Sequence, residues 1–442
     1  MNLFGTDGIR GVAYSPPLDR ETVTRVGMAL ARNLPPSPRV LIGRDTRASG
    51  PDLERWLTSG LTAAGAAVES AGVLTTPAIA FLTLRLGFDA GVVISASHNP
   101  YRDNGIKILM ASGHKLDDEI EKAIEEDVSR GRLIPEEPAS PSPPDPRFES
   151  LYVDHLIGAL GGVQPQSLPL VLDCAHGAGY RVGPELLGRL GLTPRVLAAE
   201  PNGQNINREC GSTHLEGLCR KVVEEGLSLG AALDGDGDRL LLCDKAGRLV
   251  DGDAILLASA RRLKKEGRLL GDGVVATVMS NMALEVALEH EGIRLHRTQV
   301  GDKFVSREMK ERNIVLGGEQ SGHIIYAEFA STGDGLLTLL QVLRVLALEG
   351  KGLDEVGRLE PFPQVLTSVR VTQRPDVREV PEIAEAILGA ERRLEGRGRI
   401  LVRYSGTEPL LRIMVEGPER DEIEDIAARL STAVEASIGE TA

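Results

Sequence analysis

Residues Gly91–Pro100 read GVVISASHNP, and this short stretch predicts a strand that ends in a polar loop. Val92, Val93 and Ile94 are β-branched residues, which favour a buried strand. The run then changes to serine, histidine and asparagine, and a proline stiffens the loop that follows. A buried strand that ends by presenting a hydroxyl group indicates a functional site at that end of the strand.

The same arrangement, an apolar run followed by a loop with glycine, recurs along the chain. It is found in LPLVLDCAHGAG (168–179), GAALDGDGDRL (230–240) and IVLGGEQSGH (314–323). Segments with helical periodicity, such as Asp52–Ala67 and Asp117–Ser129, lie between such runs. Strands that alternate with helices predict βαβ units on a largely parallel sheet. Three such regions indicate a repeated α/β architecture, although they share no strict residue period.

The length of the chain predicts more than one domain, because 442 residues exceed what one core usually holds. The proline-rich stretch Pro135–Ser150 is the clearest predicted boundary. Near the C-terminus a strand, a helix over Pro381–Glu391, the segment GRILVRYSGTEPLLRIMVEG and a closing helix from about Glu419 predict a small α+β domain. The predicted domains are residues 1–147, 148–251, 252–363 and 364–442.

Composition narrows the range of partners and compartments. The formal net charge of −14 argues against nucleic acid or an anionic membrane as partner. A phosphorylated small molecule is still compatible, because charges are screened over about 8 Å and local arginines set the potential of a cleft. Four cysteines without a CxxC pair indicate reduced thiols and no zinc site. The N-terminus lacks a signal-peptide core, and no run of about 18 apolar residues could span a bilayer, so we expect a cytoplasmic protein.

The loop LDGDGDRL (233–240) predicts a metal site. Asp234, Asp236 and Asp238 alternate with glycine after an apolar run, and such close carboxylates repel one another unless a cation neutralises them. Hard oxygen ligands suit Mg²⁺, and we expect one ion per chain. An EF-hand is excluded because no glutamate stands at loop position twelve. A HAD-type nucleophile normally follows the first strand, and a polar Asp-Gly turn is the structural alternative.

Two further loops carry polar groups that suit a sugar phosphate. Glu319, Ser321 and His323 alternate, so in an extended backbone all three would point the same way and could bind a polyol. A polar turn is the structural alternative. The loop RYSGTEPLLRI (403–413) offers hydroxyls, backbone NH groups and two arginines that can flank a dianion. The chain has no Walker A motif, and GAGYRVG (177–183) misses the glycine spacing of a dinucleotide site.

The neighbouring Ser97 and His98 suggest a serine hydrolase, but two features oppose that interpretation. Adjacent residues in an extended segment point to opposite faces, so His98 is poorly placed as a base for Ser97. The GxSxG elbow of such hydrolases is also absent. Lys107 lies on the next predicted strand, and a hydroxyl near a metal and a cation suits phosphorylation better than acylation.

These four loops, in this order, resemble those of the α-D-phosphohexomutase superfamily over essentially the whole chain. The resemblance implies an α/β protein of four domains around a central cleft, three similar α/β domains and a C-terminal α+β domain. FGTDGIRG at Phe4–Gly11 and Gln320 within GEQSGH resemble the branch that acts on amino-sugar phosphates. The branch directed to mannose and glucose phosphates is the alternative.

The resemblance also implies roles for individual residues in the reaction. Ser97 matches the serine that carries the catalytic phosphoryl group. The residues that match the Mg²⁺ ligands, beside the phosphoryl group on Ser97, are Asp234, Asp236 and Asp238. The residues that match positions near the reacting oxygen, where acid/base help is expected, are Arg10, Lys107 and His323.

Substrate contacts are implied in the same way. The residues that match them are Arg239, Glu319, Ser321, Arg403, Ser405, Gly406, Thr407 and Arg412. One departure is Lys303, which stands where the superfamily has arginine. Bidentate recognition is lost there, so we assign Lys303 no catalytic role.

The reaction that the resemblance implies is the interconversion of glucosamine 6-phosphate and glucosamine 1-phosphate, which feeds UDP-N-acetylglucosamine synthesis. A phosphoserine enzyme would form a hexose 1,6-bisphosphate that serves as intermediate and activator. Catalysis of this kind depends on positioning and on charge stabilisation. The expected partners are small phosphosugars, and the expected assembly is a monomer or a homodimer.

Overall fold

The GVVI run forms the third of three parallel strands in the first sheet. In the computed structural model, which describes residues 3–5, 7–137, 139–405 and 409–440, it is β5 (Ala90–Ile94), and all five residues are buried. The sheet has the order β1-β2-β6-β5-β3-β4, in which β3, β4 and β5 are parallel and the other strands join antiparallel. Its remaining strands are β1 (Phe4–Gly5), β2 (Gly8–Val12), β3 (Arg39–Arg44), β4 (Ala67–Val73) and β6 (Asp103–Met110).

Four helices accompany this sheet: α1 (Arg20–Arg32), α2 (Gly50–Ala63), α3 (Thr76–Leu86) and α4 (Asp118–Ser129). The helices α1, α2 and α4 share one aliphatic core with the sheet, and α3 packs against β3 and β5. Proline occupies the first turn of both α2 and α3, where its missing N–H costs no hydrogen bond. The proline therefore favours a helix start at this point, and α3 begins at Thr76 and packs against β5.

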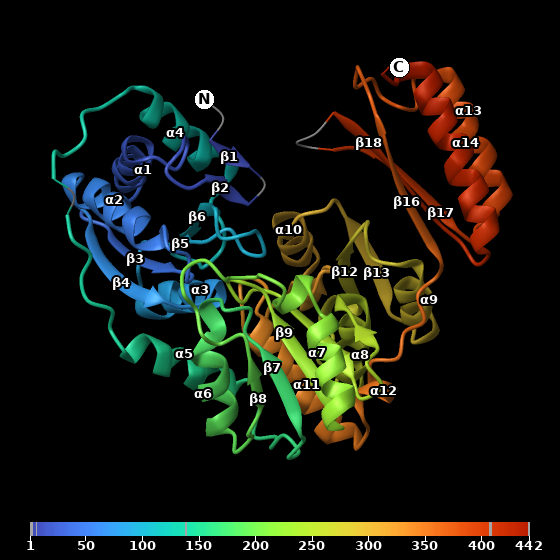
Figure 1. Cartoon of the computed structure of the whole chain (residues 1–442), viewed down its shortest axis with the longest axis horizontal. Coiled ribbons are helices and arrows are strands. Elements are labelled where there is room, and N and C mark those ends of the chain that lie inside the picture. The colour runs from blue at the N-terminus through green and yellow to red at the C-terminus, as the bar shows by residue number, and fades with distance from the viewer. Residues whose placement is uncertain (1–2, 6, 138, 406–408, 441–442) are drawn as a thin grey trace. The chain divides into compact units, whose positions relative to one another are not determined.

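The second and third sheets repeat this plan (Figure 1). The second sheet has the order β11-β10-β9-β7-β8 and the third has the order β13-β12-β14-β15. In each, three parallel strands are extended by antiparallel ones. The strands are β7 (Leu170–Asp173), β8 (Arg195–Leu197), β9 (Leu229–Leu233), β10 (Leu240–Asp244), β11 (Leu249–Val250), β12 (Gly273–Thr277), β13 (Arg294–Thr298), β14 (Leu316–Gly318) and β15 (Ile324–Tyr326).

Helices connect these strands. They are α5 (Arg147–Gly158), α6 (Val182–Arg189), α7 (Glu216–Glu225), α8 (Gly252–Lys265), α10 (Asp302–Arg312), α11 (Gly335–Glu349) and α12 (Leu353–Val356), with short 3₁₀ turns at Ala178–Tyr180, Gly211–Thr213 and Leu270–Asp272. Aspartate side chains cap α8 and α11: Asp251 accepts from Ala254 N, and Asp334 accepts from Leu337 N. These caps fix where each helix begins, close to the polar loops of the third sheet.

The chain forms two compact units, Met1–Thr277 with Ile293–Arg358, and Val278–Gly292 with Leu359–Ala442. The second unit contains a three-stranded antiparallel sheet of order β16-β18-β17, packed against two helices. Its elements are α9 (Met282–His290), β16 (Gln364–Arg370), α13 (Pro381–Leu394), β17 (Arg399–Tyr404), β18 (Leu410–Glu416) and α14 (Arg420–Ile438). Figure 1 shows α13 and α14 side by side along this sheet.

The predicted α/β class, with a smaller C-terminal α+β part, is confirmed, but two details differ from the sequence analysis. The sheets are mixed and not largely parallel, because the polar loops are too short for a crossover and so join antiparallel neighbours. The helix expected over Asp52–Ala67 is α2 and ends at Ala63, since Gly65 has a φ of 91° and β4 begins at Ala67. Helix α5 begins inside the proline-rich stretch, at Arg147.

The polar loops occupy the same topological place in each sheet. Residues 95–102 join β5 to β6, residues 234–239 join β9 to β10, and residues 319–323 join β14 to β15. Each loop therefore links the third parallel strand to an antiparallel neighbour. This shared position places one polar loop at the equivalent edge of every α/β sheet.

Candidate active site

Ser97 lies in the loop after β5, where its hydroxyl meets a carboxylate from the second sheet. The residue is 2% exposed, and its φ of 51° is in the left-handed region that non-glycine residues seldom adopt. Ser97 Oγ donates to Asp234 Oδ2 at 2.5 Å. Ser97 N donates to Ser95 Oγ at 2.9 Å, which helps to hold the turn. The structure thus brings together the two residues to which the sequence analysis gave the phosphoryl group and the metal.

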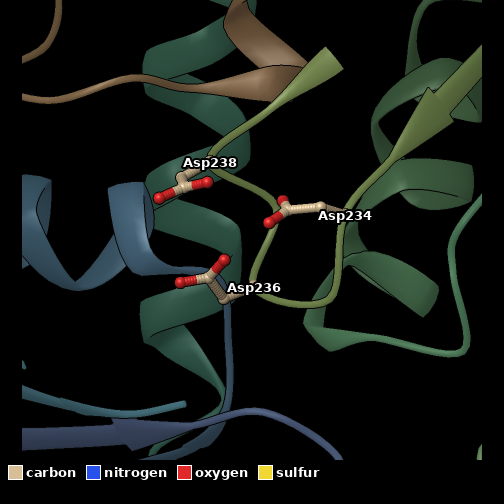
Figure 2. Close-up of side chains that lie close together, drawn as sticks. All are labelled: Asp234, Asp236 and Asp238. Carbon is tan, nitrogen blue, oxygen red and sulfur yellow. The ribbon is translucent and has the colours of Figure 1, made fainter. Parts of the chain in front are cut away.

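Asp234, Asp236 and Asp238 come from the β9–β10 loop, and Figure 2 shows the three carboxylates gathered about the same small space. All three side chains are buried, and each offers an oxygen within 4.8 Å of the others. Lys107 on β6 contacts two of them, with Nζ at 2.9 Å from Asp236 Oδ2 and 3.4 Å from Asp238 Oδ2. Thr76 Oγ1 also donates to Asp236 Oδ2, at 2.6 Å.

Glycine alternates with aspartate in this loop for steric reasons. A Cβ at Gly235 would lie 2.4 Å from the carbonyl oxygen of Ser97, which is closer than real Cβ contacts. Gly237 has a φ of 73°, and a Cβ there would lie 2.7 Å from Thr75. The two glycines therefore let the acidic loop approach both the serine loop and the start of α3.

Charge is unevenly distributed among these groups. Burial raises the pKa of Asp234 well above its ordinary value, and the carboxylates of Asp238 and Asp236 raise it further. Burial acts in the same direction on Asp238, but Lys107 and His323 outweigh it and hold that pKa well below its ordinary value. Burial would lower the pKa of Lys107, yet Asp236 and its neighbours raise it well above the ordinary value. Lys107 is therefore a buried cation at neutral pH.

The acidic cluster fits a divalent cation. Asp236 Oδ1 and Asp238 Oδ1 are buried and accept no hydrogen bond from the part of the chain that the structure describes. Buried carboxylate oxygens are costly when they lack a partner. Three carboxylates with oxygen ligands only and few other donors match the preference of Mg²⁺. We therefore regard Asp234, Asp236 and Asp238 as residues that could hold Mg²⁺.

A chain of ion pairs links the serine loop to the third sheet. Asp7 contacts Arg10, Lys107 and Lys115, and Lys115 Nζ also lies 2.7 Å from Asp302 Oδ2. Burial acts to raise the pKa of Asp7, but Lys107 and Lys115 outweigh it and lower the pKa. Arg10 also donates from Nη1 to the carbonyl oxygen of Ala96, at 3.0 Å. This hydrogen bond places Arg10 beside the serine loop.

His98 lies closer to Ser97 than the sequence analysis expected. That expectation assumed an extended segment, but Ser97 is left-handed, and Ser97 Oγ lies 3.3 Å from His98 Nδ1. Burial, followed by Arg239 and Arg10, lowers the pKa of His98 to about 4. His98 is thus a neutral imidazole beside the serine at neutral pH, and the geometric argument against it was wrong.

The loop between β14 and β15 is a tight turn and not an extended segment, so its three polar residues do not share one face by alternation. Gly322 N donates to the Glu319 carbonyl at 2.9 Å. Ser321 Oγ donates to Glu319 Oε2 at 3.3 Å, and Glu319 Oε1 accepts from Gly301 N at 3.2 Å. The third residue, His323, is buried, with 3% of its surface exposed.

His323 faces the acidic loop. Its Nδ1 lies 3.6 Å from Asp238 Oδ2, and its Nε2 accepts from Gly333 N at 3.0 Å. Nδ1 therefore carries the proton in the neutral form. Burial lowers the pKa of His323, but Asp238 outweighs burial and the pKa is raised. The histidine and the β9–β10 loop are thus joined electrostatically across two sheets.

Arg239 is the basic residue of the acidic loop. Its backbone N donates to Asp234 Oδ1 at 3.2 Å, and its Nε lies 3.9 Å from Asp238 Oδ1. Burial acts against the charged form, but Asp238 and Asp234 raise the pKa of the guanidinium. Arg239 therefore stays charged beside the carboxylates, as a cation that could contact a bound anion.

Two of the arginines predicted to bind phosphate lie opposite each other on neighbouring strands of the second compact unit. Arg403 on β17 and Arg412 on β18 are direct cross-strand partners. Burial and Arg412 lower the pKa of Arg403. Ser405 N donates to the Leu410 carbonyl at 2.8 Å. The predicted residues Gly406 and Thr407 lie outside the described residues.

Sequence reasoning missed several residues that contact the site. They are Asp7, Arg47, Thr76, Asn207 and Asp302. Asp7 lies within the FGTDGIRG motif, and that motif could have identified it as a site residue. Asp302 lies beside Lys303 in a segment compared with the superfamily pattern, so it also had a signal. Arg47, Thr76 and Asn207 lie in stretches without distinctive composition, and only the tertiary fold brings them to the serine or to its carboxylates.

The fold and the site together define a class of protein. It has repeated α/β sheets, and the loops after their third parallel strands bring a serine hydroxyl to a cluster of carboxylates that could hold Mg²⁺. Four family models match the chain along its length. They are the phosphoglucomutase/phosphomannomutase alpha/beta/alpha domain I over residues 1–134, domain II over 150–247, domain III over 251–361 and the C-terminal domain over 366–433. The chain belongs to the phosphoglucomutase/phosphomannomutase family.

Individual relatives extend over the full length. The phosphoglucosamine mutase of Solibacter usitatus is 45% identical over 446 residues, covering 99% of each chain. A phosphoglucomutase/phosphomannomutase family protein from Burkholderia thailandensis has a similar solved structure, with TM-score 0.82, 22% identity and 99% of each chain covered. The N-acetylphosphoglucosamine mutase of Aspergillus fumigatus, solved with GlcNAc-6P and magnesium, has TM-score 0.68 and 19% identity, covering 98% of this chain and 95% of that one. No helix among the described residues is both long and apolar enough to cross a membrane.

Proposed function

We propose that this protein interconverts glucosamine 6-phosphate and glucosamine 1-phosphate through a phosphoserine at Ser97 and a hexose 1,6-bisphosphate. The observation that carries the proposal is the buried contact between Ser97 Oγ and Asp234 Oδ2, beside two further carboxylates and the Lys107 cation. The choice of an amino sugar is supported by full-length relatives that are named phosphoglucosamine mutase, at 43–46% identity.

The reaction moves one phosphoryl group at a time. The bond between phosphorus and Ser97 Oγ breaks as phosphorus bonds to the free oxygen of the sugar monophosphate, whose hydroxyl proton passes to a base. The bisphosphate then returns its other phosphoryl group to Ser97, and the departing sugar oxygen takes up a proton. Ser97 is suited to this exchange because its hydroxyl is buried, fixed and surrounded by charged groups.

The proposed acid/base residues hold their protons differently. Lys107 is cationic at neutral pH and can neutralise charge that develops on the transferring group. The pKa of His323 is raised, which favours the protonated form that can donate, whereas the pKa of His98 is lowered to about 4, so His98 is neutral at pH 7. Arg10, beside the serine loop, adds a further cation near the reacting oxygen.

Mg²⁺, held by Asp234, Asp236 and Asp238 with the phosphoryl group on Ser97, would neutralise charge on the phosphoryl oxygens. Arg239, Glu319 and Ser321 are proposed to bind the substrate from the first compact unit. Within the second unit, the paired Arg403 and Arg412 are proposed to hold the phosphate that is not transferred, together with Ser405, Gly406 and Thr407. Location in the cytoplasm and a monomeric or homodimeric state stay predictions.

A coupled assay tests the substrate. Glucosamine 6-phosphate, mannose 1-phosphate and glucose 1-phosphate should each be supplied with Mg²⁺ and catalytic hexose 1,6-bisphosphate. We expect the highest kcat/KM with glucosamine 6-phosphate. Faster turnover of either neutral sugar would replace the amino-sugar assignment with that of a phosphomannomutase or phosphoglucomutase of the same family.

The Ser97→Ala variant tests whether Ser97 carries the phosphoryl group. The variant should lose mutase activity while it keeps the fold and most of its Mg²⁺ affinity, since the three carboxylates stay in place. Phosphopeptide mapping of the wild-type protein should locate the phosphoryl group on Ser97. A phosphoryl group found on another residue would refute the assignment.

A further inference from the structure

Two side chains from different parts of the fold hold the same two carbonyl groups of the serine loop. The Ser97 carbonyl accepts from Arg47 Nη2 at 2.9 Å and from Asn207 Nδ2 at 2.8 Å. The Asn99 carbonyl accepts from the same two atoms, at 2.8 Å and 3.0 Å. We call Arg47 and Asn207 the carbonyl clamp. Its four hydrogen bonds fix the Ser97–His98 and Asn99–Pro100 peptide planes.

Arg47 is the arm of the clamp that comes from the first sheet. Its side chain is fully buried, and its Nε donates to Asp45 Oδ2 at 2.8 Å. Nη1 donates to the carbonyl oxygens of Pro100 and Asp103, the second at 2.9 Å. A buried guanidinium is retained only where its hydrogen bonds are made, and here the serine loop supplies most of them.

Asn207 is the arm that comes from the second sheet. It is 6% exposed and left-handed, with a φ of 58°, and its backbone N donates to the Ala175 carbonyl at 2.9 Å. Its Oδ1 accepts no hydrogen bond from the described residues. The hydrogen bonds that the structure gives this side chain therefore both go to the serine loop, at a backbone conformation that only a few residue types tolerate.

The two arms are also tied to each other. Ala48 N donates to the Gly203 carbonyl at 2.9 Å, and Thr46 Oγ1 donates to the His176 carbonyl at 2.6 Å. The segment that contains Arg47 is therefore bound to the loops of the second sheet near Asn207. A shift of either segment would move both donors relative to the serine loop.

We propose that Asn207, acting with Arg47, is a positioning residue for phosphoryl transfer at Ser97. The proposal rests on the proposed function. Ser97 is held in a left-handed conformation, and the direction of its Cα–Cβ bond depends on the Ser97–His98 peptide plane, which the clamp fixes. The clamp thereby aims Ser97 Oγ at Asp234 Oδ2. Misplacement of a reacting group by about 1 Å costs on the order of 100-fold in rate.

Asn207→Gly removes the clamp arm without backbone strain, because glycine adopts the left-handed conformation freely. Glu209→Gly is the matched control: Glu209 lies on the same segment, is exposed, and has a φ of 56°. Asn207→Asp is a second variant that keeps the size of the side chain but turns an oxygen toward the two carbonyls. It serves if the glycine variant does not fold.

The first readout is the rate at which Mg²⁺-loaded full-length protein gains a phosphoryl group on Ser97 from glucose 1,6-bisphosphate, followed by quenched-flow mass spectrometry. We expect Asn207→Gly to slow this step about 10- to 100-fold, with KM for bisphosphate and the melting temperature close to the wild-type values. Glu209→Gly should stay within about twofold, as expected for a surface substitution. A rate within twofold of wild type for the Asn207 variants, or an equal loss in Glu209→Gly, would overturn the proposal.

The second readout is hydrogen exchange of the amides of residues 95–102, which needs no turnover. Exchange of the Ser97 and Asn99 amides should be faster in Asn207→Gly than in wild type and in Glu209→Gly. Faster exchange together with an unchanged phosphorylation rate would also overturn the positioning role. A wild-type protein that bisphosphate does not phosphorylate would count against the proposed function, while unchanged exchange in Asn207→Gly would count against the clamp itself.

Discussion

Thr76→Val should weaken Mg²⁺ binding although Thr76 is not one of the proposed ligands. Thr76 begins α3, where its hydroxyl donates to Asp236 Oδ2 at 2.6 Å and its backbone N donates to the Asp236 carbonyl at 2.9 Å. Lys107 Nζ binds the same Oδ2, at 2.9 Å. With Oδ2 occupied twice, the buried Oδ1 is left to face a cation. Valine keeps the shape of threonine and removes only the hydroxyl.

The size of the effect follows from this geometry. A hydrogen bond to a charged group contributes about 1.5–3 kcal/mol. Loss of a residue that orients a metal ligand lowers metal affinity about 10- to 100-fold, which corresponds to about 1.4–2.7 kcal/mol. The two ranges overlap because both describe the same effect, the loss of the hydrogen bond that holds the Asp236 carboxylate in place. We expect the Kd for Mg²⁺ to rise by that factor.

Calorimetric titration of Mg²⁺, repeated with Mn²⁺ and detected by electron paramagnetic resonance, measures the change without reference to turnover. The control is Thr83→Val on the same helix, whose buried hydroxyl donates only to the Ile79 carbonyl, at 2.7 Å. A Kd for Thr76→Val within twofold of wild type would refute the reasoning. So would an equal loss in Thr83→Val, since that would point to a general effect on α3.

Three further substitutions have defined outcomes. Burial acts to raise the pKa of the 12% exposed Glu266, but Arg344 and two other arginines outweigh it and lower that pKa to about 2, so Glu266→Gln should cost about 2 kcal/mol at pH 7. Because this folded-state pKa lies below the unfolded value, the difference from wild type should shrink as pH falls from 4.5 toward 2, as measured by denaturant titration. Gly235→Ala should abolish phosphorylation of Ser97 in the quenched-flow assay, whereas Gly188→Ala, with open space around its Cβ, should not. Lys107→Gln should lower kcat by about 100- to 1,000-fold in the coupled assay, and a loss confined to KM would contradict its role.

Sequence reasoning found the loops of the candidate site because each one breaks an apolar strand with glycine and polar side chains. That signal is local, and it located Ser97 and the aspartates of the β9–β10 loop before their contact was visible. The antiparallel direction of the strands that flank these loops could also have been predicted from the sequence. Residues 95–102 and 234–239 are shorter than any parallel crossover, so antiparallel neighbours follow from loop length alone.

Other features of the site depend on contacts that no local pattern carries. Arg47, Thr76 and Asn207 are ordinary residues in their own segments, and they reach the site over separations of 50, 160 and 110 positions. The left-handed backbone conformation of Ser97 could not be predicted from the local pattern either, because serine rarely adopts a positive φ. This left-handed conformation brings His98 Nδ1 within 3.3 Å of Ser97 Oγ, contrary to the prediction.

The common position of the polar loops has a consequence for the order of assembly. Each loop joins strands that are neighbours in sequence, so it can form while its own sheet folds. The contacts between loops are different: Ser97 and Asp234 are 137 positions apart, and Lys107 and Asp236 are 129 apart. During synthesis the serine loop therefore stays exposed to water until the second sheet has been made and has folded. A substitution that weakens the contact between the folded sheets is therefore expected to leave native secondary structure but to separate Ser97 from Asp234.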